Sequence, residues 1–437
     1  MTNTRRSVHA AIVVATLAAA HAALAQSLPV PDGRISIYAQ AGRTRSDVGG
    51  AGYSYDDVAC SLDLHSPERE AAGFEYRFDG RGATYGYGER TNRFSLNDGW
   101  LGFQTAGGVR VRVGQVWLNE LGALGAVGGG VIEYRGKKRS KIGRLRLGLF
   151  GGLEPKGFEA GYVNGVRKAG AFVALEGDGA RRHVLGFVTI RNSGLTERSV
   201  LTMSNFIGSG RSFSLYQVAE ADLSGPAGNG SGGLTYLFAM ARGQVHPMVE
   251  LSATYHRGRS IDTRTITQDQ LNGRPISAAA LSGFLYESAG GRITISPIPS
   301  LRIHGGYSSD RSNRDDGRLS RITAGISLMN AFGSGIDLTA SDSRYQRTGG
   351  STDSWYVSAG RNLGPKVYLS VSYSTSFSVL RFTNGGVVIE SRPEIRRLAL
   401  DGVIHLGRSV SLIVGAEETR DEVSTDDRGT LGLTFRF

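Results

Sequence analysis

Arginine alternates with valine in the segment GVRVRVGQVW (108–117). Val109, Val111 and Val113 share one face of an extended chain, and Arg110 and Arg112 share the other. Strict alternation is typical of a β-strand whose two faces meet different surroundings. If the valine face meets lipid, the arginine face must meet a water-filled interior, where rings of arginine concentrate and select anions.

The same polar-face pattern recurs in RLRLGLF (144–150), LRIHGG (301–306) and RITAGISLM (321–329). It predicts a set of pore-lining side chains: Arg110, Arg112, Arg144, Arg146, Arg302, His304 and Arg321. A second interpretation has these arginines forming salt bridges inside the wall that hold its shape. The sequence leaves both open.

A 26-residue stretch at 118–143 is the expected constriction or lid. Its first half is apolar and rich in Gly and Ala, and could pack inside a lumen. Its second half carries the basic residues Lys137, Lys138, Arg139 and Lys141. The alternative is an exposed surface loop whose basic run touches lipopolysaccharide phosphates.

No motif predicts catalysis, a metal or a cofactor. The histidines are scattered singly, and neither H-E-x-x-H nor G-x-S-x-G occurs. The single cysteine, Cys60, is expected in the first long loop and allows no intrachain disulfide. We therefore expect no enzyme, no cofactor and no metal site, although a membrane enzyme built from a few dispersed residues is compatible with this pattern.

Period-2 alternation along almost the whole chain predicts strands as the positioning elements. FEYRFD (74–79), KVYLSVSYS (366–374) and LGLTFRF (431–437) all alternate in this way. The connections alternate between long polar segments and tight turns, which favours an all-β fold: a transmembrane antiparallel up-and-down β-barrel. We expect an even number of about 16–22 strands, the upper figure if FEYRFDGRGATYGYGE is split into a hairpin at Asp79-Gly80. The expected long extracellular loops are 42–71, 118–143, 257–277 and 381–394, with the tight turns on the periplasmic side.

The first 25 residues read as a cleaved signal peptide. Arg5 and Arg6 precede an apolar run, and Ala23-Leu24-Ala25 provides a cleavage site. Residues 26–437 would then form a single barrel domain. The formal net charge of +11 comes without a basic helix or zinc-finger spacing, so no nucleic-acid partner is expected.

The sequence resembles Gram-negative outer-membrane β-barrel proteins of the porin-like kind. Three features carry the resemblance: the ending GLTFRF, the early strand RISIYAQAG (34–42), and the hairpin WLGFQTAGGVRVRVGQVW (100–117). It implies the outer membrane as location, with lipid and lipopolysaccharide around the barrel. It also implies that Phe435 and Phe437 form the signal read by the barrel-assembly machinery.

The resemblance implies a channel for passive diffusion of small polar solutes, anions among them. Two alternatives stay open. One is a secretion conduit for exopolysaccharide; the other is a barrel without a pore, serving as receptor, adhesin, sleeve for an electron-transfer partner, or membrane enzyme. The oligomeric state is not indicated by the sequence.

Overall fold

The fold is described from a computed structural model. It covers residues 31–50, 52–67, 72–86, 91–138, 143–177, 181–209, 212–225, 228, 231–314, 317–384 and 387–437. The expected signal peptide lies outside the described residues.

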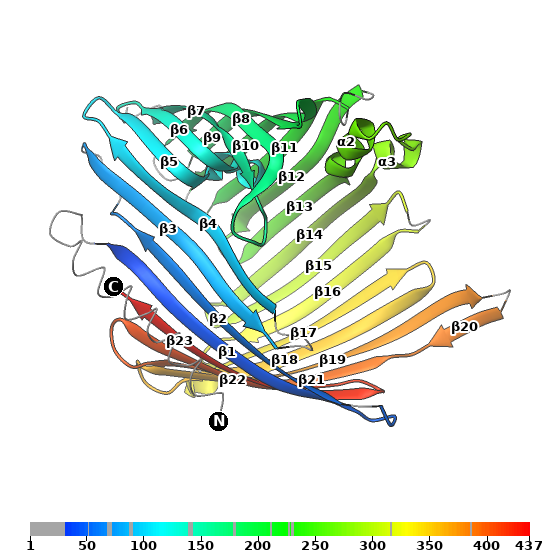
Figure 1. Ribbon diagram of the computed structural model, residues 1–437. Coiled ribbons are helices and arrows are strands. Elements are labelled where there is room, and N and C mark those ends of the chain that lie inside the picture. Colours follow the sequence, from blue (N-terminus) through cyan, green and yellow to red (C-terminus); the bar gives the residue numbers. More distant parts are fainter. Residues whose placement is uncertain are drawn as a thin grey trace, which may run out of the picture.

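A single antiparallel sheet closes into a barrel (Figure 1). Its strands are β1 (Asp32–Ser46), β2 (Tyr53–His65), β3 (Gly73–Tyr85), β4 (Thr91–Gln104), β5 (Val109–Trp117), β6 (Ala126–Arg135), β7 (Arg144–Pro155), β8 (Tyr162–Glu176), β9 (Arg181–Asn192), β10 (Leu195–Ser209), β11 (Phe213–Ser224), β12 (Ser231–His246), β13 (Val249–Ser260), β14 (Phe284–Ile298), β15 (Leu301–Ser312), β16 (Leu319–Leu328), β17 (Ile336–Arg347), β18 (Gly350–Asn362), β19 (Val367–Asn384), β20 (Val387–Ser391), β21 (Glu394–His405), β22 (Val410–Arg420) and β23 (Ser424–Arg436). The helices are the 3-10 helices η1 (Asn119–Gly125) and η3 (Ala331–Gly333) and the α-helices α2 (Thr263–Leu271) and α3 (Ala278–Ser282).

The barrel closes where the first strand pairs with the last. Strand β1 is hydrogen-bonded to both β2 and β23. Strand β20 pairs only with the far end of β19, while the rest of β19 pairs with β21. The wall therefore has 22 strands, which confirms the all-β antiparallel barrel and its even strand number. Closure leaves the two terminal strands of the wall without a free edge.

One large connection distinguishes the two ends of the barrel. The start of β1, the end of β23 and the tight turns at 106–108, 243–247, 296–300, 332–335, 362–366 and 406–409 all lie at one end, the terminal end. The opposite end carries the largest connection, residues 261–283, which holds α2 and α3 (Figure 1).

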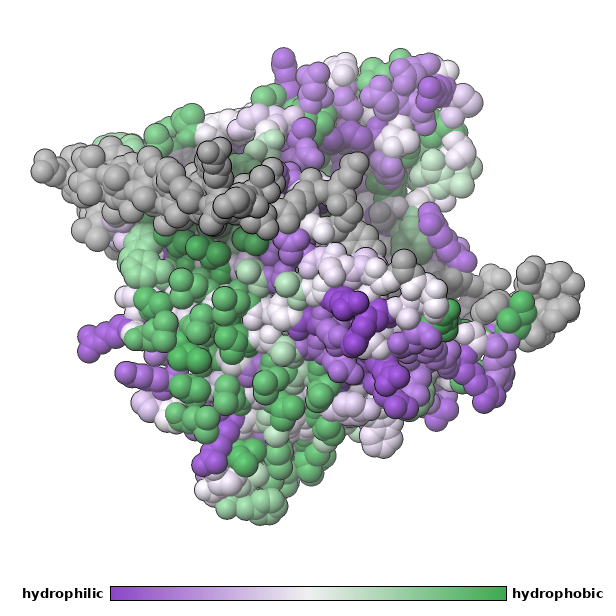
Figure 2. All heavy atoms as spheres, turned by 60° about the horizontal axis from the view of Figure 1, so that its bottom comes forward, coloured by the Kyte–Doolittle hydropathy of each residue, from purple (hydrophilic) through white to green (hydrophobic). Residues whose placement is uncertain are grey.

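Apolar side chains cover the outside of the wall. The outward residues include Val113, Leu149, Ile322, Trp355, Val371 and Leu431, each more than a third exposed. Hydrophobic residues form a broad field on the face shown in Figure 2, with hydrophilic residues beside it. A closed sheet satisfies its own backbone hydrogen bonds, so it can present such a face to lipid. No helix among the described residues is long and apolar enough to span a membrane.

Several expected loops are strands instead. The range 42–71 contains the end of β1 and all of β2, so only the turns around 47–52 and 66–72 remain. Cys60 lies within β2, opposite Ile37, and not in a loop. The polar stretches misled the prediction because the inward face of these strands carries Ser and Asp.

Two further ranges are also partly strand. Segment 381–394 contains the end of β19 and all of β20, which form a hairpin that continues the wall. The range 257–277 agrees with the observed connection, except that β13 runs to Ser260. Residues 73–85 form one strand, β3. The Asp79-Gly80 position is a register shift against β4 and not a hairpin turn.

Strand β6 runs through the middle of the expected 118–143 loop. Its glycines, Gly128 to Gly130, pair with Leu153, Gly152 and Gly151 of β7, and a glycine-rich sequence gives a weak strand signal. The two halves of this stretch are therefore at opposite ends of the barrel. Helix η1 lies at the barrel end that carries α2, whereas β6 ends with Arg135 at the terminal end, followed by Lys137 and Lys138.

Among the described residues, the buried apolar side chains fill the interior along one side. A cluster of buried apolar side chains lies on the inner faces of β4–β10 and on η1: Trp100, Val116, Leu118, Leu121, Leu124, Val127, Val131, Phe150, Val166, Phe172, Ala174, Val184, Val188, Ile190 and Val200. Helix η1 enters the lumen and packs on β8, β9 and β10. Gly186 lets it approach closely, because a Cβ there would overlap the Leu121 side chain.

Candidate functional site

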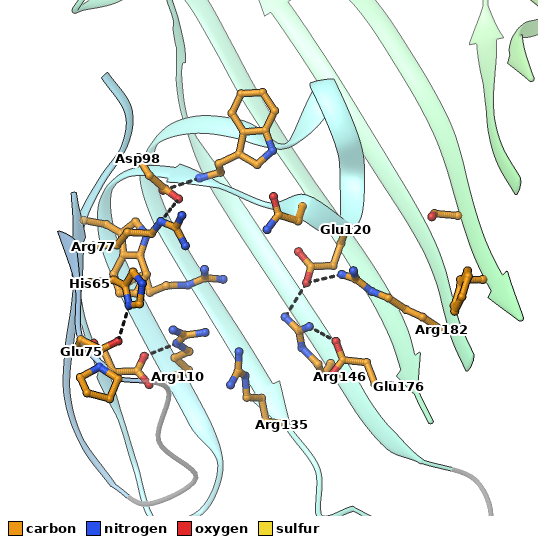
Figure 3. Close-up of a pocket in the computed structure, with 18 of the residues that line it drawn as sticks. His65, Glu75, Arg77, Asp98, Arg110, Glu120, Arg135, Arg146, Glu176 and Arg182 are labelled. Atoms are coloured by element: carbon orange, nitrogen blue, oxygen red, sulfur yellow. Dashed lines mark hydrogen bonds and ion pairs between the residues drawn. The ribbon is translucent and has the colours of Figure 1, made fainter. Parts of the chain in front are cut away.

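An arginine-rich cavity of about 810 Å³ lies beside this filled side of the lumen (Figure 3). Seven arginines line it together with four carboxylates: Arg77, Arg110, Arg112, Arg135, Arg146, Arg181 and Arg182, with Glu75, Asp98, Glu120 and Glu176. The cavity has the size of a small-molecule site, and its charge balance is positive.

Strand β5 places Arg110 and Arg112 inward, as the alternation predicts. Val113 is 63% exposed on the outer face, while Arg110 and Arg112 are 9% and 7% exposed. The guanidinium groups of both arginines lie over the Trp100 ring, 5.2 and 5.4 Å from its centroid. Cation–π contact and packing against the indole hold the two side chains in fixed positions.

Glu133 joins three arginines from neighbouring strands. Its Oε2 accepts from Arg112 at 3.1 Å, and its Oε1 accepts from both Arg135 and Arg146 at 2.7 Å. Glu133 is fully buried. A buried carboxylate is tolerated only with such compensation, so this cluster braces the wall of β5–β7.

Glu120 brings helix η1 into the same network. Its Oε1 lies 2.8 Å from Arg146 and 3.2 Å from Arg182. Arg146 also bonds Glu176 of β8, and Arg110 bonds Glu75 of β3 at 2.5 Å. The ion pairs of Glu120 and the apolar contacts of η1 therefore both fix this helix against the wall.

The network leaves some hydrogen-bonding capacity unused at the cavity. Arg112 Nε, Arg182 Nε and Glu75 Oε1 are buried without a hydrogen-bond partner among the described residues. Arg181 is exposed at the start of β9, and the Arg182 side chain is 40% exposed. The accessible guanidinium groups of Arg181 and Arg182 make the cavity able to bind a small anion.

The remaining predicted pore-lining residues lie elsewhere. Arg144 faces inward at the start of β7, half-buried. Arg302, His304 and Arg321 lie on the inner face of β15 and β16, in the part of the lumen that the apolar cluster does not fill. Arg321 stacks over Tyr345 at 4.9 Å. The structure thus brings together Arg110, Arg112 and Arg146, but not the other candidates.

Lys137 and Lys138 do not contribute to the expected constriction. Lys137 and Lys138 are exposed in the turn after β6, at the terminal end, while Arg139 and Lys141 lie outside the described residues. The prediction was wrong for Lys137 and Lys138 because β6 separates them from the inward-folded helix η1.

A second inward segment, α2, lies at the same end of the barrel as η1 and packs on β10. Arg264 of α2 contacts Glu154 of β7 at 2.7 Å and Glu197 of β10 at 3.1 Å, and Ile266 is buried. The α2 N-cap is Asp262, whose carboxylate accepts from the Thr265 backbone N–H at 3.0 Å and from its hydroxyl at 2.7 Å. These bonds, the backbone one first, hold the pKa of Asp262 below its usual range.

The carboxy-terminal phenylalanines lie at the closure of the barrel. Phe435 faces outward opposite Ile35 of β1, and its ring lies 5.7 Å from that of Phe437. Phe437 exchanges backbone hydrogen bonds with Gly33 at 3.0 and 3.1 Å. At this position both rings can face lipid, beside the pairing of β1 with β23 that closes the barrel.

Sequence reasoning missed the carboxylates that organise the site. Glu133 alternates with Ile132 and Tyr134 in GGGVIEYR, so the strand pattern could have found it. Glu120 and Arg182 carried no comparable signal, because their contact depends on the inward path of η1. Within the described ranges, no group of three His, Cys, Asp or Glu side chains is placed to hold a metal ion.

No protein-family model and no curated protein matches this chain. Solved structures with a similar overall arrangement include OccAB4 of Acinetobacter baumannii, with 9% identity, 94% of this chain and 99% of that chain covered, and a TM-score of 0.44. Another is OccK8 (OprE) of Pseudomonas aeruginosa, with 10% identity, coverage of 93% and 98%, and a TM-score of 0.44. A third is the outer membrane channel DcaP of Acinetobacter baumannii, with 9% identity, coverage of 93% and 96%, and a TM-score of 0.39. Likenesses this distant decide neither family nor activity, so the strand pairing and the side-chain directions carry the conclusions about this chain.

Proposed function

We propose that this chain is an outer-membrane channel through which small polar solutes diffuse, with a preference for anions. One observation carries the proposal: a closed barrel with an apolar outer face contains a cavity lined by seven arginines and only four carboxylates. Positive lining of a water-filled passage raises the local concentration of anions.

The ion pairs indicate which arginines would give the channel its preference for anions. Arg110, Arg112 and Arg146 are buried and bonded to carboxylates, so their main role is to shape the wall. Arg181 and Arg182 are the more exposed cations of the cavity. They are therefore the residues that an entering anion meets in water.

The remaining sequence expectations belong to the same proposal. The segment 1–25 directs export, Phe435 and Phe437 serve recognition by the barrel-assembly machinery, and lipid with lipopolysaccharide surrounds the outer face. Exposed arginines such as Arg259 lie on the outer side near the α2 end. They would bind the phosphate groups of lipopolysaccharide.

Single-channel recording in planar bilayers tests the proposal. The purified protein should conduct, and under a KCl gradient the reversal potential should indicate preference for chloride. The double variant Arg181→Gln, Arg182→Gln should move the reversal potential toward the cation value, because two accessible charges are removed from the passage. Arg259→Gln, which removes a charge from the outer face, is the matched control and should leave it unchanged.

Absence of any conductance from folded protein would overturn the channel proposal. Conductance with an unchanged reversal potential in the double variant would instead refute the anion preference while leaving the channel intact.

A further inference from the structure

A continuous row of aromatic rings crosses the inner face of four adjacent strands. It consists of Tyr216 on β11, Phe238 on β12, His256 on β13 and Tyr286 on β14. Successive ring centroids are 6.0, 6.3 and 5.6 Å apart. Tyr236 of β12 lies beside the row, 5.3 Å from His256. We call these five residues the aromatic row.

The register places the aromatic row in the lumen. Tyr216 lines the arginine-rich cavity, and residues two apart on a strand share a face. Phe238 pairs directly with His256, and Tyr286 with Gly258, so all the rings lie on the same side as Tyr216. The outward positions of β13 and β14 hold apolar residues such as Leu251 and Ile293.

The aromatic row is open to solutes and is not part of the apolar cluster. None of its rings is buried, and none belongs to the cluster under η1. Aromatic side chains that form a half-exposed row inside a polar lumen offer ring faces for stacking.

Polar groups border the ring faces. Ser288 lies two residues after Tyr286 on the same face of β14, and Asp310 of β15 is its register partner. Ser288 is also the register partner of His256, and Glu220 is the partner of Tyr236. A sugar ring has the matching chemistry, because its C–H face packs on an aromatic ring while its hydroxyl edge forms hydrogen bonds. An unsubstituted hydrocarbon ring would leave these polar partners unused.

One end of the aromatic row meets the cationic cavity. Tyr216 and the nearby Phe206 line the cavity together with Arg112, Arg146 and Arg182. Tyr286, at the other end, follows the α2–α3 connection closely in the chain. A ligand that stacks along the row therefore reaches arginines, which bind carboxylates in preference to neutral groups.

We propose that the aromatic row and the arginine-rich cavity together form a binding track for acidic oligosaccharides, whose sugar rings carry carboxylates. This rests on the proposed channel function and names the solute class that the passage takes. The rings hold the sugar faces, and the cavity arginines hold the carboxylates.

Block of the ion current by oligosaccharides tests the track. Trigalacturonate, maltotriose and benzoate are added separately to single channels of the full-length protein. Trigalacturonate should interrupt the current at lower concentration than maltotriose, and benzoate should have little effect. In the Phe238→Ala, Tyr286→Ala variant the half-blocking concentration of trigalacturonate should rise about tenfold, about 1.4 kcal/mol.

Two controls separate binding from folding. Trp355→Ala removes an aromatic side chain that is exposed on the outer face of β18 and should leave the block unchanged. Phe238→Tyr keeps a ring in the row and should retain the block.

The results that would refute the binding track differ from the result that would refute the channel. Normal conductance without a trigalacturonate block, a block unaffected by the row variant, or a block as strong with maltotriose or benzoate would each overturn the acidic-oligosaccharide track. None of these outcomes would refute a channel, which only a lack of conductance would do.

Discussion

Two regions of this barrel use the same strand pattern for different purposes. The inner faces of β4–β10 carry bulky apolar residues and paired charges, covered by η1. The inner faces of β15–β19 instead carry mostly small hydroxyl residues and glycine, such as Ser327, Thr339, Ser358 and Ser372. The first region therefore behaves like the core of a globular protein, and the second like the bare wall of a channel.

This difference shows why a charge on the inner face cannot be assigned a role from alternation alone. Arg112 and Arg321 both face inward, but Arg112 is bonded to the buried Glu133 while Arg321 is exposed beside Tyr345. Buried pairs are costly to break, whereas exposed pairs contribute little. The two regions should therefore respond differently to equivalent substitutions.

The largest effect is expected from Glu133→Gln. It removes the charge that compensates Arg112, Arg135 and Arg146 in a buried position, and should destabilise the folded barrel by about 3–5 kcal/mol. Urea unfolding in lipid vesicles, followed by tryptophan fluorescence, measures this. Glu417→Gln is the matched control, because Glu417 also bonds two arginines, Arg397 and Arg428, but on the less filled side. If the control costs as much, the proposed difference between the regions is wrong.

The next effect concerns the attachment of η1. Leu121→Ala removes a fully buried side chain that packs over Gly186 and should cost about 2–5 kcal/mol of local stability. Release of the helix should increase the amplitude of conductance fluctuations in single channels. Leu121→Met, which nearly conserves volume, should cost less than about 1.5 kcal/mol, and steady currents in the alanine variant would contradict the anchoring role.

A smaller effect is expected from Arg264→Gln on α2. This change breaks the contacts to Glu154 and Glu197, whose strength is reduced by the partial exposure of Arg264. Added protease should cleave the segment 261–283 faster, by about fivefold for a loss of about 1 kcal/mol. Arg274→Gln, at the exposed end of the same connection, should not change the rate.

An effect of similar size is expected at the α2 N-cap. Asp262→Ala removes the acceptor for the Thr265 N–H and should lower helix stability by about 1 kcal/mol. Because folding lowers the pKa of Asp262, its contribution is fully present above the unfolded value of about 4 and is lost as pH falls through the folded value. Protease sensitivity of the wild-type segment should therefore rise below about pH 4, and the variant should show no such rise.

The barrel itself could be predicted from the sequence because lipid imposes a simple rule on every strand. Alternation in GVRVRVGQVW and LGLTFRF determines which side chains face out. The 42–71 segment was misjudged because polar residues on an inward face, such as Asp57 and Asp63, look like loop residues.

The site was less predictable because it depends on contacts between distant segments. Alternation placed Arg110, Arg112 and Arg146 inward, but their partners Glu75 and Glu120 come from another strand and from a helix folded into the lumen. Strand β6 was hidden by its run of glycines, so the apolar and basic halves of 118–143 were assigned to one loop.

Thiol accessibility tests the asymmetry of the lumen most directly. Cys60→Ser gives a background without cysteine, into which Ser372→Cys or Val188→Cys is introduced. Both positions face inward; Ser372 is half-exposed on the bare wall, and Val188 is fully buried in the apolar cluster. With a water-soluble maleimide, the cysteine at 372 should react rapidly and the cysteine at 188 on the order of a hundredfold more slowly. Equal reaction rates would contradict the filled side of the lumen, and with it the account of how the arginine-rich cavity is built.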